Sequence, residues 1–173
     1  MQVIIELLIQ HTSDAHPWFQ QARRSRRSPF RDYYLWADSD DDDTPPMFPG
    51  VEESIWSWDD EAGQYFRHMF YRHEPDLNLA SPAVIKEVEN IVIFWLKLGV
   101  SGFRLDAASH LTKQAGRGEE KRGLWLLEHL RRLVERHNPQ AILLGEVDVE
   151  VAQYRDYFGD NNRLNMVLNF WLN

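Results

Sequence analysis

Four short runs of apolar residues recur along the chain, separated by longer stretches in which apolar residues follow a helical spacing. Short runs that are nearly continuous in Val, Ile and Leu are typical of strands buried on both faces of a parallel sheet. We therefore predict four parallel strands, near residues 3–9, 100–105, 141–145 and 165–171. Glu6 is the only charged residue within the first of them.

Two helices are predicted between these strands. The first has Ser81 as a good N-cap and Pro82 at its first position, and Gly99 can end it. The apolar residues that recur at helical spacing along it are Val84, Val88, Ile91, Val92, Trp95 and Leu96. The second helix covers about residues 119–137. Its predicted inward residues are Leu126, Leu127, Leu130, Leu133 and Val134. A polar stretch that includes Gly116 and Gly118 follows the strand that ends near residue 105.

Residues 12–80 do not follow this alternation. They combine loops rich in Pro, Gly and Asp with stretches dense in Trp and Tyr, and a turn signal lies near residues 59–63. We expect an aromatic and acidic insertion with a small hairpin rather than a second domain. The acidic run from Asp38 to Asp43 has Asp where an EF-hand loop needs Gly, so it is interpreted as a solvated loop.

The alternation of strands and helices argues for parallel β-α units and an α/β fold. A doubly wound sheet and a β/α barrel both satisfy this pattern. No glycine-rich phosphate loop follows any predicted strand, which disfavours the nucleotide-binding form of the doubly wound sheet. We expect residues 1–173 to form one domain.

Composition narrows the classes of protein. Of the 173 residues 43% are hydrophobic, enough for one core, and the net charge of -8 argues against a nucleic-acid surface. The basic cluster of Arg23, Arg24, Arg26 and Arg27 is interpreted as a solvated helix end. There is no cysteine, no apolar run of the roughly 20 residues that cross a membrane, and no signal peptide. We expect a cytoplasmic protein with no nucleic-acid or membrane partner.

Polar residues follow the first three predicted strands at the point where each strand ends. They are Gln10 and His11, then Arg104 and Asp106, and finally Glu146. In a β/α barrel the carboxyl ends of the strands share one face, where active sites form. Taken singly, each residue fits a structural role as a cap, a loop residue or half of an ion pair.

An Asp and a Glu at neighbouring strand ends form a more specific pattern. Two carboxyl groups that flank a glycosidic bond are the usual equipment of glycosidases. Asp106 would attack the anomeric carbon, and Arg104, on the same face of the strand, would keep it ionised. Glu146 follows an apolar run, and partial desolvation there would raise its pKa, as a proton donor requires.

Three stretches, "IIELLIQH", "GFRLDA" and "LLGEV", resemble signature regions of the α-amylase superfamily of retaining glycoside hydrolases. "EPDLN" resembles an additional signature of the oligo-1,6-glucosidase-type subgroup. The resemblance implies a TIM (β/α)8 barrel in which Asp106 is the nucleophile, Arg104 contacts it and Glu146 is the general acid/base. It also implies that His11 binds the sugar. His110 stands where amylases carry the His of a Lys-His pair, so we expect it to bind substrate as well.

Two longer stretches, "HTSDAHPWFQQARRSRRSPFRDYYLWAD" and "WSWDDEAGQYFRHMFYRHEPDLN", most resemble trehalose synthases. This resemblance implies a retaining double displacement at α-glucosidic bonds that interconverts maltose and trehalose. The expected partner is an α-linked di- or oligosaccharide, and no organic cofactor is needed. An α-glucosidase of the oligo-1,6-glucosidase type and a catalytically inactive truncated homologue are the alternatives.

The chain departs from the family pattern at the first and fourth signatures. The first usually carries an Asn that helps to hold a calcium ion, and Gln10, longer by one methylene, stands there as the candidate calcium ligand. The fourth, a His-Asp pair, is missing, and a whole barrel takes about 250 residues. We therefore expect a fragment that spans roughly the third to sixth strands, with the insertion after the third. We expect it to be inactive alone and to self-associate through open sheet edges.

Overall fold

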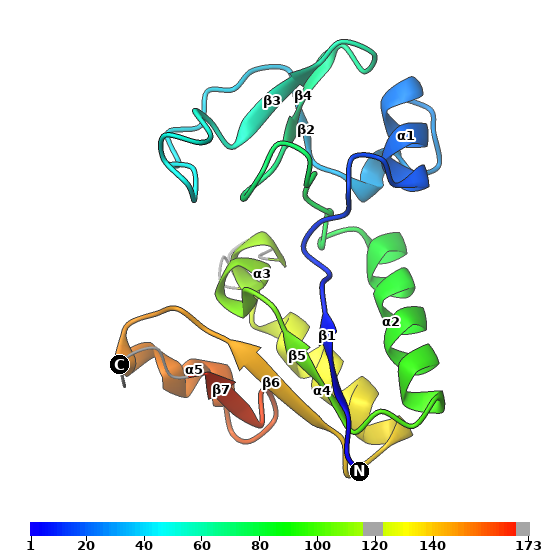
Figure 1. Ribbon diagram of the computed structural model, residues 1–173, viewed down its shortest axis with the longest axis vertical. Helices are drawn as coiled ribbons and strands as arrows, with labels where there is room; N and C mark the ends of the chain where they lie inside the picture. Colours follow the sequence, from blue (N-terminus) through cyan, green and yellow to red (C-terminus); the bar gives the residue numbers. More distant parts are fainter. Residues whose placement is uncertain (116–122, 169–173) are drawn as a thin grey trace. The chain divides into compact units, whose positions relative to one another are not determined.

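The computed structural model describes residues 1–115 and 123–168. The chain divides into two compact units. The first unit contains Met1–Ile9 and the chain from Ile85 onward, and the second contains Gln10–Val84 (Figure 1). The predicted insertion of residues 12–80 falls within the second unit.

The first unit is built on a four-stranded parallel sheet. Its strands are β1 (Ile4–Leu7), β5 (Gly102–Leu105), β6 (Ile142–Glu146) and β7 (Met166–Leu168), in the order β1-β5-β6-β7. Every neighbouring pair is parallel. The four predicted strands and their direction are confirmed, except that the part of the last prediction beyond Leu168 lies outside the described residues.

Helices α2 (Pro82–Lys97), α3 (Ala108–Ala115) and α4 (Trp125–His137) accompany this sheet. α2 begins at Pro82 as predicted, and Gly99, just after its end, has a φ of 91°, a left-handed conformation that suits glycine. α4 begins at Trp125 rather than at Glu119, and residues 116–122 lie outside the described residues. All five residues predicted to face inward from this helix are buried.

Two features of the helices were not predicted. The polar stretch after Asp106 forms α3, because Ala108, Leu111 and Ala115 recur at helical spacing and are all buried. Ile91 and Trp95 belong to the apolar spacing of α2, yet each is 37% exposed. α2 buries the narrower stripe of Val84, Val88, Val92 and Leu96.

The chain returns from β6 to β7 through η2 (Val151–Gln153) and α5 (Tyr154–Phe158). Asn165 joins the end of this return to β6 through two hydrogen bonds with Leu143. Its side-chain Oδ1 accepts the N–H of Leu143 at 2.8 Å, and its own N–H donates to the carbonyl of Leu143 at 2.9 Å. The residue before β7 is therefore paired with β6 before the regular ladder begins.

The second unit contains a three-stranded antiparallel sheet with the order β2-β4-β3. Its elements are β2 (Trp36–Ala37), β3 (Trp56–Asp59), β4 (Gln64–Arg67), helix α1 (Pro17–Arg24) and the short helix η1 (Arg31–Tyr33). β3 and β4 form the predicted hairpin, and Gly63 provides a φ of 60° in its turn. Phe19 of α1 is buried and packs against the rings of Tyr34, Trp36 and Phe66, with centroid distances of 5.0, 5.7 and 5.2 Å. The aromatic content of this segment thus forms a core.

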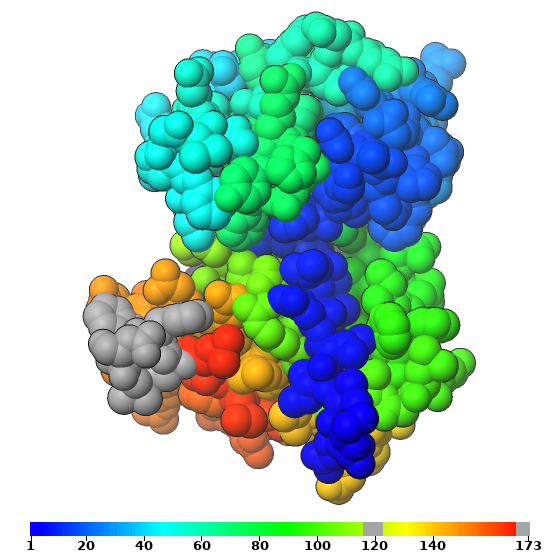
Figure 2. Space-filling view, in the orientation of Figure 1, coloured from blue at the N-terminus to red at the C-terminus, as the bar shows by residue number. Residues whose placement is uncertain are grey.

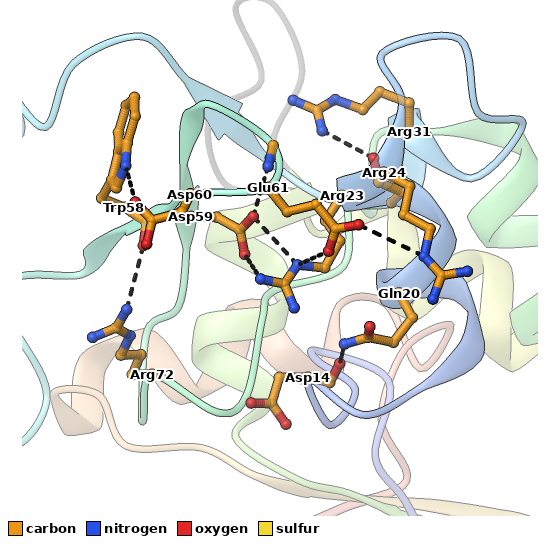
Figure 3. A network of polar contacts seen from close by, with 12 residues as sticks. Asp14, Gln20, Arg23, Arg24, Arg31, Trp58, Asp59, Asp60, Glu61 and Arg72 are labelled. Atoms are coloured by element: carbon orange, nitrogen blue, oxygen red, sulfur yellow. Dashed lines mark hydrogen bonds and ion pairs between the residues drawn. The ribbon is translucent and has the colours of Figure 1, made fainter.

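Ion pairs tie α1 to the β3–β4 hairpin (Figure 3). Nη2 of Arg23 lies 2.8 Å from Oδ2 of Asp59, and Asp59 also accepts the N–H of Ala62 at 2.7 Å. Arg23 and Arg24 both reach Glu61, at 3.4 and 3.7 Å. The interpretation of the basic cluster as a solvated helix end is wrong for Arg23, because the hairpin turn buries Asp59 and a buried carboxylate needs a partner.

Among the helices that the structure describes, none combines the length and the apolar character needed to cross a membrane. The surface nevertheless carries apolar side chains along β1, an outermost strand of the described sheet. Val3, Ile4 and Leu8 are exposed, and the N-terminal segment, blue in Figure 2, lies on the face shown there. β1 is therefore a sheet edge that no charged side chain other than Glu6 protects.

Two glycines of the sheet, Gly102 and Gly145, should lose different amounts of stability when each is replaced by alanine. A Cβ at Gly102 would lie 2.4 Å from the backbone oxygen of Ile142, so Gly102→Ala must push β5 away from β6. We expect it to lower the free energy of unfolding by about 2–3 kcal/mol, as overpacking does. A Cβ at Gly145 would meet the Cδ1 of Leu164 at 2.4 Å, a flexible side-chain end that can move. Gly145→Ala should cost about 1 kcal/mol. Urea unfolding followed by circular dichroism measures both, and a larger loss in Gly145→Ala would contradict this account.

Candidate active site

Arg104 lies at the centre of a charged group at the carboxyl ends of three strands. It is the third residue of β5 and is level with Glu6 of β1 in the parallel register. Asp106 follows the last residue of β5, and Glu146 is the last residue of β6. The register also places the residues before Asp106 and Glu146 level with each other. Parallel strands end at the same edge of a sheet, so these four side chains meet there.

The guanidinium of Arg104 contacts three carboxylates. Its Nη1 donates to Oε1 of Glu6 and to Oδ1 of Asp106, the second at 2.7 Å, and its Nη2 donates to Oε2 of Glu146. The side chains of Arg104, Asp106 and Glu146 are each 29% exposed. Three negative charges thus face one positive charge in a site that water reaches only in part. Such an arrangement favours proton uptake by one of the carboxylates.

Glu146 is the carboxyl group whose pKa rises. Burial raises it most, and the hydrogen bond with Asp106 and the negative charge of Asp106 raise it further. The charge of Arg104 and the backbone N–H of Ala107 lower it, without cancelling the rise above the ordinary 4.5. The direction agrees with the one predicted from the sequence, and it suits a group that must hold a proton to donate.

Ala107 makes the turn from β5 into α3. Its φ is 44°, in the left-handed region that costs an L-residue roughly 1–2 kcal/mol. Its carbonyl accepts the N–H of His110 at 2.8 Å and of Leu111 at 3.1 Å, so α3 starts directly after Asp106. Because its N–H hydrogen-bonds to Glu146, this residue links the two carboxyl groups through the backbone.

The structure places the two histidines expected to bind substrate on different elements. His110 lies in the first turn of α3 and is partly buried. His11 belongs to the second unit, where its Nε2 lies 3.9 Å from Oε1 of Glu74 and its ring packs edge-on against Phe70 at 5.8 Å. Sugar contacts by these histidines stay a prediction, as do the catalytic roles of Asp106 and Glu146.

Gln10, the candidate calcium ligand, is buried in the second unit, and its side chain hydrogen-bonds to Asp76. Asp76 also pairs with the guanidinium of Arg67. Calcium takes about six to eight oxygen ligands, usually with several carboxylates. Within residues 1–115 and 123–168, no three or more His, Cys, Asp or Glu side chains converge in a metal-binding group. The residues around Gln10 therefore do not fit a calcium ion.

Sequence reasoning missed the part that Glu6 plays in this site. Glu6 was noticed only as an interruption of an apolar strand. A charged residue in such a run is itself a signal, because its burial costs free energy unless a partner faces it. The partner, Arg104, is 98 residues away and becomes evident only when β1 and β5 are neighbours.

Comparison with known proteins shows the family of this chain. A model of the alpha-amylase catalytic domain matches residues 1–173. The chain belongs to this family. It is 43% identical over 180 residues to the trehalose synthase of Thermus thermophilus and 33% identical over 198 residues to the oligo-1,6-glucosidase of Heyndrickxia coagulans. Among solved structures, the alpha-amylase from H. orenii matches with a TM-score of 0.84 and 34% identity.

The matches cover the chain but only part of each relative. The alignments with the trehalose synthase and the oligo-1,6-glucosidase cover 98% of this chain, yet 18% and 34% of those proteins. The structural match covers 99% of this chain and 33% of the amylase. The chain therefore spans about a fifth to a third of the length of these family members. Its α/β fold with a parallel sheet is that of the TIM-barrel amylase family.

The contacts of Arg104 with Glu6, Asp106 and Glu146 predict how Glu146 titrates. With a raised pKa, the folded protein holds more protons than the unfolded chain just above pH 4.5. The stabilisation is thus complete below pH 4.5 and is lost as the pH rises through the raised pKa. We expect Asp106→Asn to lower the pKa of Glu146 by removing a negative charge, and Arg104→Met to raise it.

Carbon-13 NMR titration of the glutamate carboxyl groups measures these shifts. Asp160→Asn, which neutralises an exposed carboxylate on another loop, is the matched control and should leave Glu146 unchanged. A pKa of Glu146 that stays the same or rises in Asp106→Asn would contradict the assigned electrostatics.

Proposed function

We propose that this chain carries the nucleophile and the general acid/base of an enzyme that transfers α-glucosyl groups with retention and interconverts maltose and trehalose. The observation that carries the proposal is the guanidinium of Arg104 bonded to both Asp106 and Glu146. Retaining enzymes need two carboxyl groups about 5–5.5 Å apart. Neighbouring strands are about 4.8 Å apart, so residues at adjacent strand ends suit that separation.

In the first step Asp106 attacks the anomeric carbon of the glucosyl residue and forms a carbon–oxygen bond with it. The glycosidic bond breaks on the opposite face, and Glu146 gives its proton to the departing oxygen. Glucose leaves as a neutral molecule, and a covalent glucosyl-enzyme remains. Two features support these roles: Arg104 donates a hydrogen bond to Asp106 and so places a positive charge beside the attacking oxygen, and the pKa of Glu146 is raised.

In the second step Glu146, now ionised, takes a proton from an acceptor hydroxyl. The acceptor oxygen attacks the anomeric carbon and displaces Asp106, which returns to its carboxylate form. If the acceptor is the anomeric hydroxyl of the glucose just released, the product is trehalose. If the acceptor is water, the product is a second glucose.

Hydrolysis is the second candidate function, and the similarity to the oligo-1,6-glucosidase of H. coagulans supports it. The higher identity with the trehalose synthase of T. thermophilus favours transfer. The two functions share both carboxyl groups and differ in the acceptor alone. The ratio of trehalose to free glucose formed from maltose separates them.

The proposal includes an architecture and a location. We infer that β1, β5, β6 and β7 are the third to sixth strands of a (β/α)8 barrel and that residues 1–173 belong to one catalytic domain. We also infer that His11 and His110 contact the sugar. The similarity along the whole chain to a solved alpha-amylase supports this arrangement. A cytoplasmic location is part of the same proposal.

The test places this chain in the trehalose synthase of T. thermophilus, in exchange for the matching stretch. We expect the chimaera to convert maltose to trehalose and Asp106→Asn to reduce this turnover by roughly a thousandfold or more, because the bond-forming oxygen is neutralised. Mass spectrometry with a fluorinated glucosyl fluoride should find the trapped sugar on the peptide that contains Asp106. The control, Asp160→Asn, should keep full activity. Retained turnover in Asp106→Asn would refute the assignment.

Glu146→Gln in the same chimaera distinguishes the acid from the nucleophile. It should slow maltose cleavage by about 100- to 10,000-fold, because the departing sugar needs a proton. Glucosyl-enzyme formation from an activated aryl glucoside should be much less affected, since that leaving group departs unprotonated. Equal losses on both substrates would argue against Glu146 as the acid.

We also propose that the chain associates with itself through the edges of its parallel sheet. β1 and β7 are the outermost of the described strands, and β1 exposes Val3 and Ile4. We expect the average mass in sedimentation equilibrium to rise with concentration. Ile4→Lys should reduce the rise, because a charge at an edge opposes strand pairing. The matched control is Asn90→Lys, which adds the same single charge at an exposed position of α2. A monomer at all concentrations would contradict this proposal.

A further inference from the structure

Asp76 is the most completely buried carboxylate in the second unit, with 0% of its surface exposed. Its backbone joins two segments that are distant in sequence. It forms an antiparallel bridge with His11, just after β1, and its N–H donates to the carbonyl of Arg67 at 2.9 Å, at the end of β4. The buried carboxylate therefore lies where these two segments meet.

The neutralising group is a guanidinium. Nη1 of Arg67 donates to Oδ2 of Asp76 at 2.5 Å, and the arginine side chain is 20% exposed. Gln10 and the backbone N–H of Met69 add uncharged hydrogen bonds to the same carboxyl group. Burial raises the pKa of Asp76 to about 6, against the opposing effects of Arg67 and these two groups. The carboxylate thus depends on one cation for its charge balance.

A calcium ion bound by the first signature would lie at this same place. Gln10 stands at the position of the signature that usually helps to hold calcium, and its side chain hydrogen-bonds to the buried carboxylate of Asp76. A calcium ion bound to Asp76 would lie about 2.3–2.6 Å from its oxygen and close to the guanidinium, so two positive groups would compete for one negative charge. Among the described side chains, no second or third carboxylate joins Asp76 in a metal-binding group to relieve this repulsion.

We propose that the guanidinium of Arg67 is a built-in substitute for a calcium ion between Gln10 and Asp76. The cation that links the two segments is supplied by β4 itself, and the folding of the second unit does not depend on a divalent metal. The inference goes beyond the proposed function, because it concerns residues outside the catalytic group and holds whether or not the chain transfers glucose.

One feature of the carboxylate makes the proposal sharply testable. Oδ1 of Asp76 is buried and, among the described atoms, accepts no well-aligned hydrogen bond, while Oδ2 receives Arg67. Removal of the guanidinium would leave a buried carboxylate with an oxygen open to a metal ion. Arg67→Met, which removes the charge and keeps an unbranched apolar stem, should therefore create a calcium dependence that the natural chain lacks.

The experiment compares the melting temperature of the full chain in excess chelator and in millimolar calcium at constant ionic strength. We expect no shift that depends on Asp76 in the natural chain, so the natural chain and Asp76→Asn should respond equally to calcium. Equal responses also remove any contribution from the acidic loop at Asp38 to Asp43, which both proteins carry. A calcium-induced rise in the natural chain that Asp76→Asn abolishes would overturn the proposal.

Arg67 variants provide the second measurement. In chelator, Arg67→Met should melt on the order of 10 °C lower than the natural chain, as expected when half of a buried ion pair is removed. Calcium should restore several degrees in this variant, but not in Arg67→Met combined with Asp76→Asn. Arg67→Lys keeps the positive charge and should remain insensitive to calcium. Sensitised terbium luminescence, excited through the tryptophans, gives a readout that does not depend on unfolding. Terbium binding that requires Asp76 in the natural chain would refute the inference.

Discussion

The carboxyl edge of the parallel sheet depends on a single guanidinium. β1, β5 and β6 each bring a carboxylate to the same edge, and the three groups would repel one another without Arg104. The register that aligns β1 with β5 places Glu6 opposite the arginine, and the register of β5 with β6 places the residues before Asp106 and Glu146 level with each other. The strand register therefore brings the carboxylates together, and the positive charge of Arg104 offsets the repulsion between them.

Among the arginine–carboxylate pairs of the described chain, those of Arg104, Asp59 and Asp76 differ in how deeply the carboxylate is buried. The carboxyl groups around Arg104 are partly exposed, so a substrate can reach them. Asp59 and Asp76 are buried, while their arginines are partly exposed, and these two pairs hold segments together within the second unit. The same pair of side chains serves reactivity at one place and cohesion at the other two, and access to water makes the difference.

Local patterns allowed prediction of much of the first unit. The apolar runs located all four strands, and the buried stripe of α4 followed from its spacing. The features that were missed depend on contacts that the spacing of apolar residues does not indicate. α3 was missed because its buried face includes polar residues: Thr112, for example, satisfies its hydroxyl internally by donating to the carbonyl of Ser109. Arg104 and Asp106 could be paired from the sequence because they are two residues apart. Glu6 and Asp76 could not, since their partners depend on how distant segments align.

The left-handed turn at Ala107 limits which sequences can occupy this edge. Gly, Asn and Asp adopt such a conformation with the least strain. Gly would loosen the one joint between Asp106 and α3, while Asp would add a fourth negative charge next to Glu146. Larger β-branched residues would resist the turn altogether. Alanine is thus a compromise between backbone strain and local charge, so this position constrains the chain although the residue itself has no reactive group.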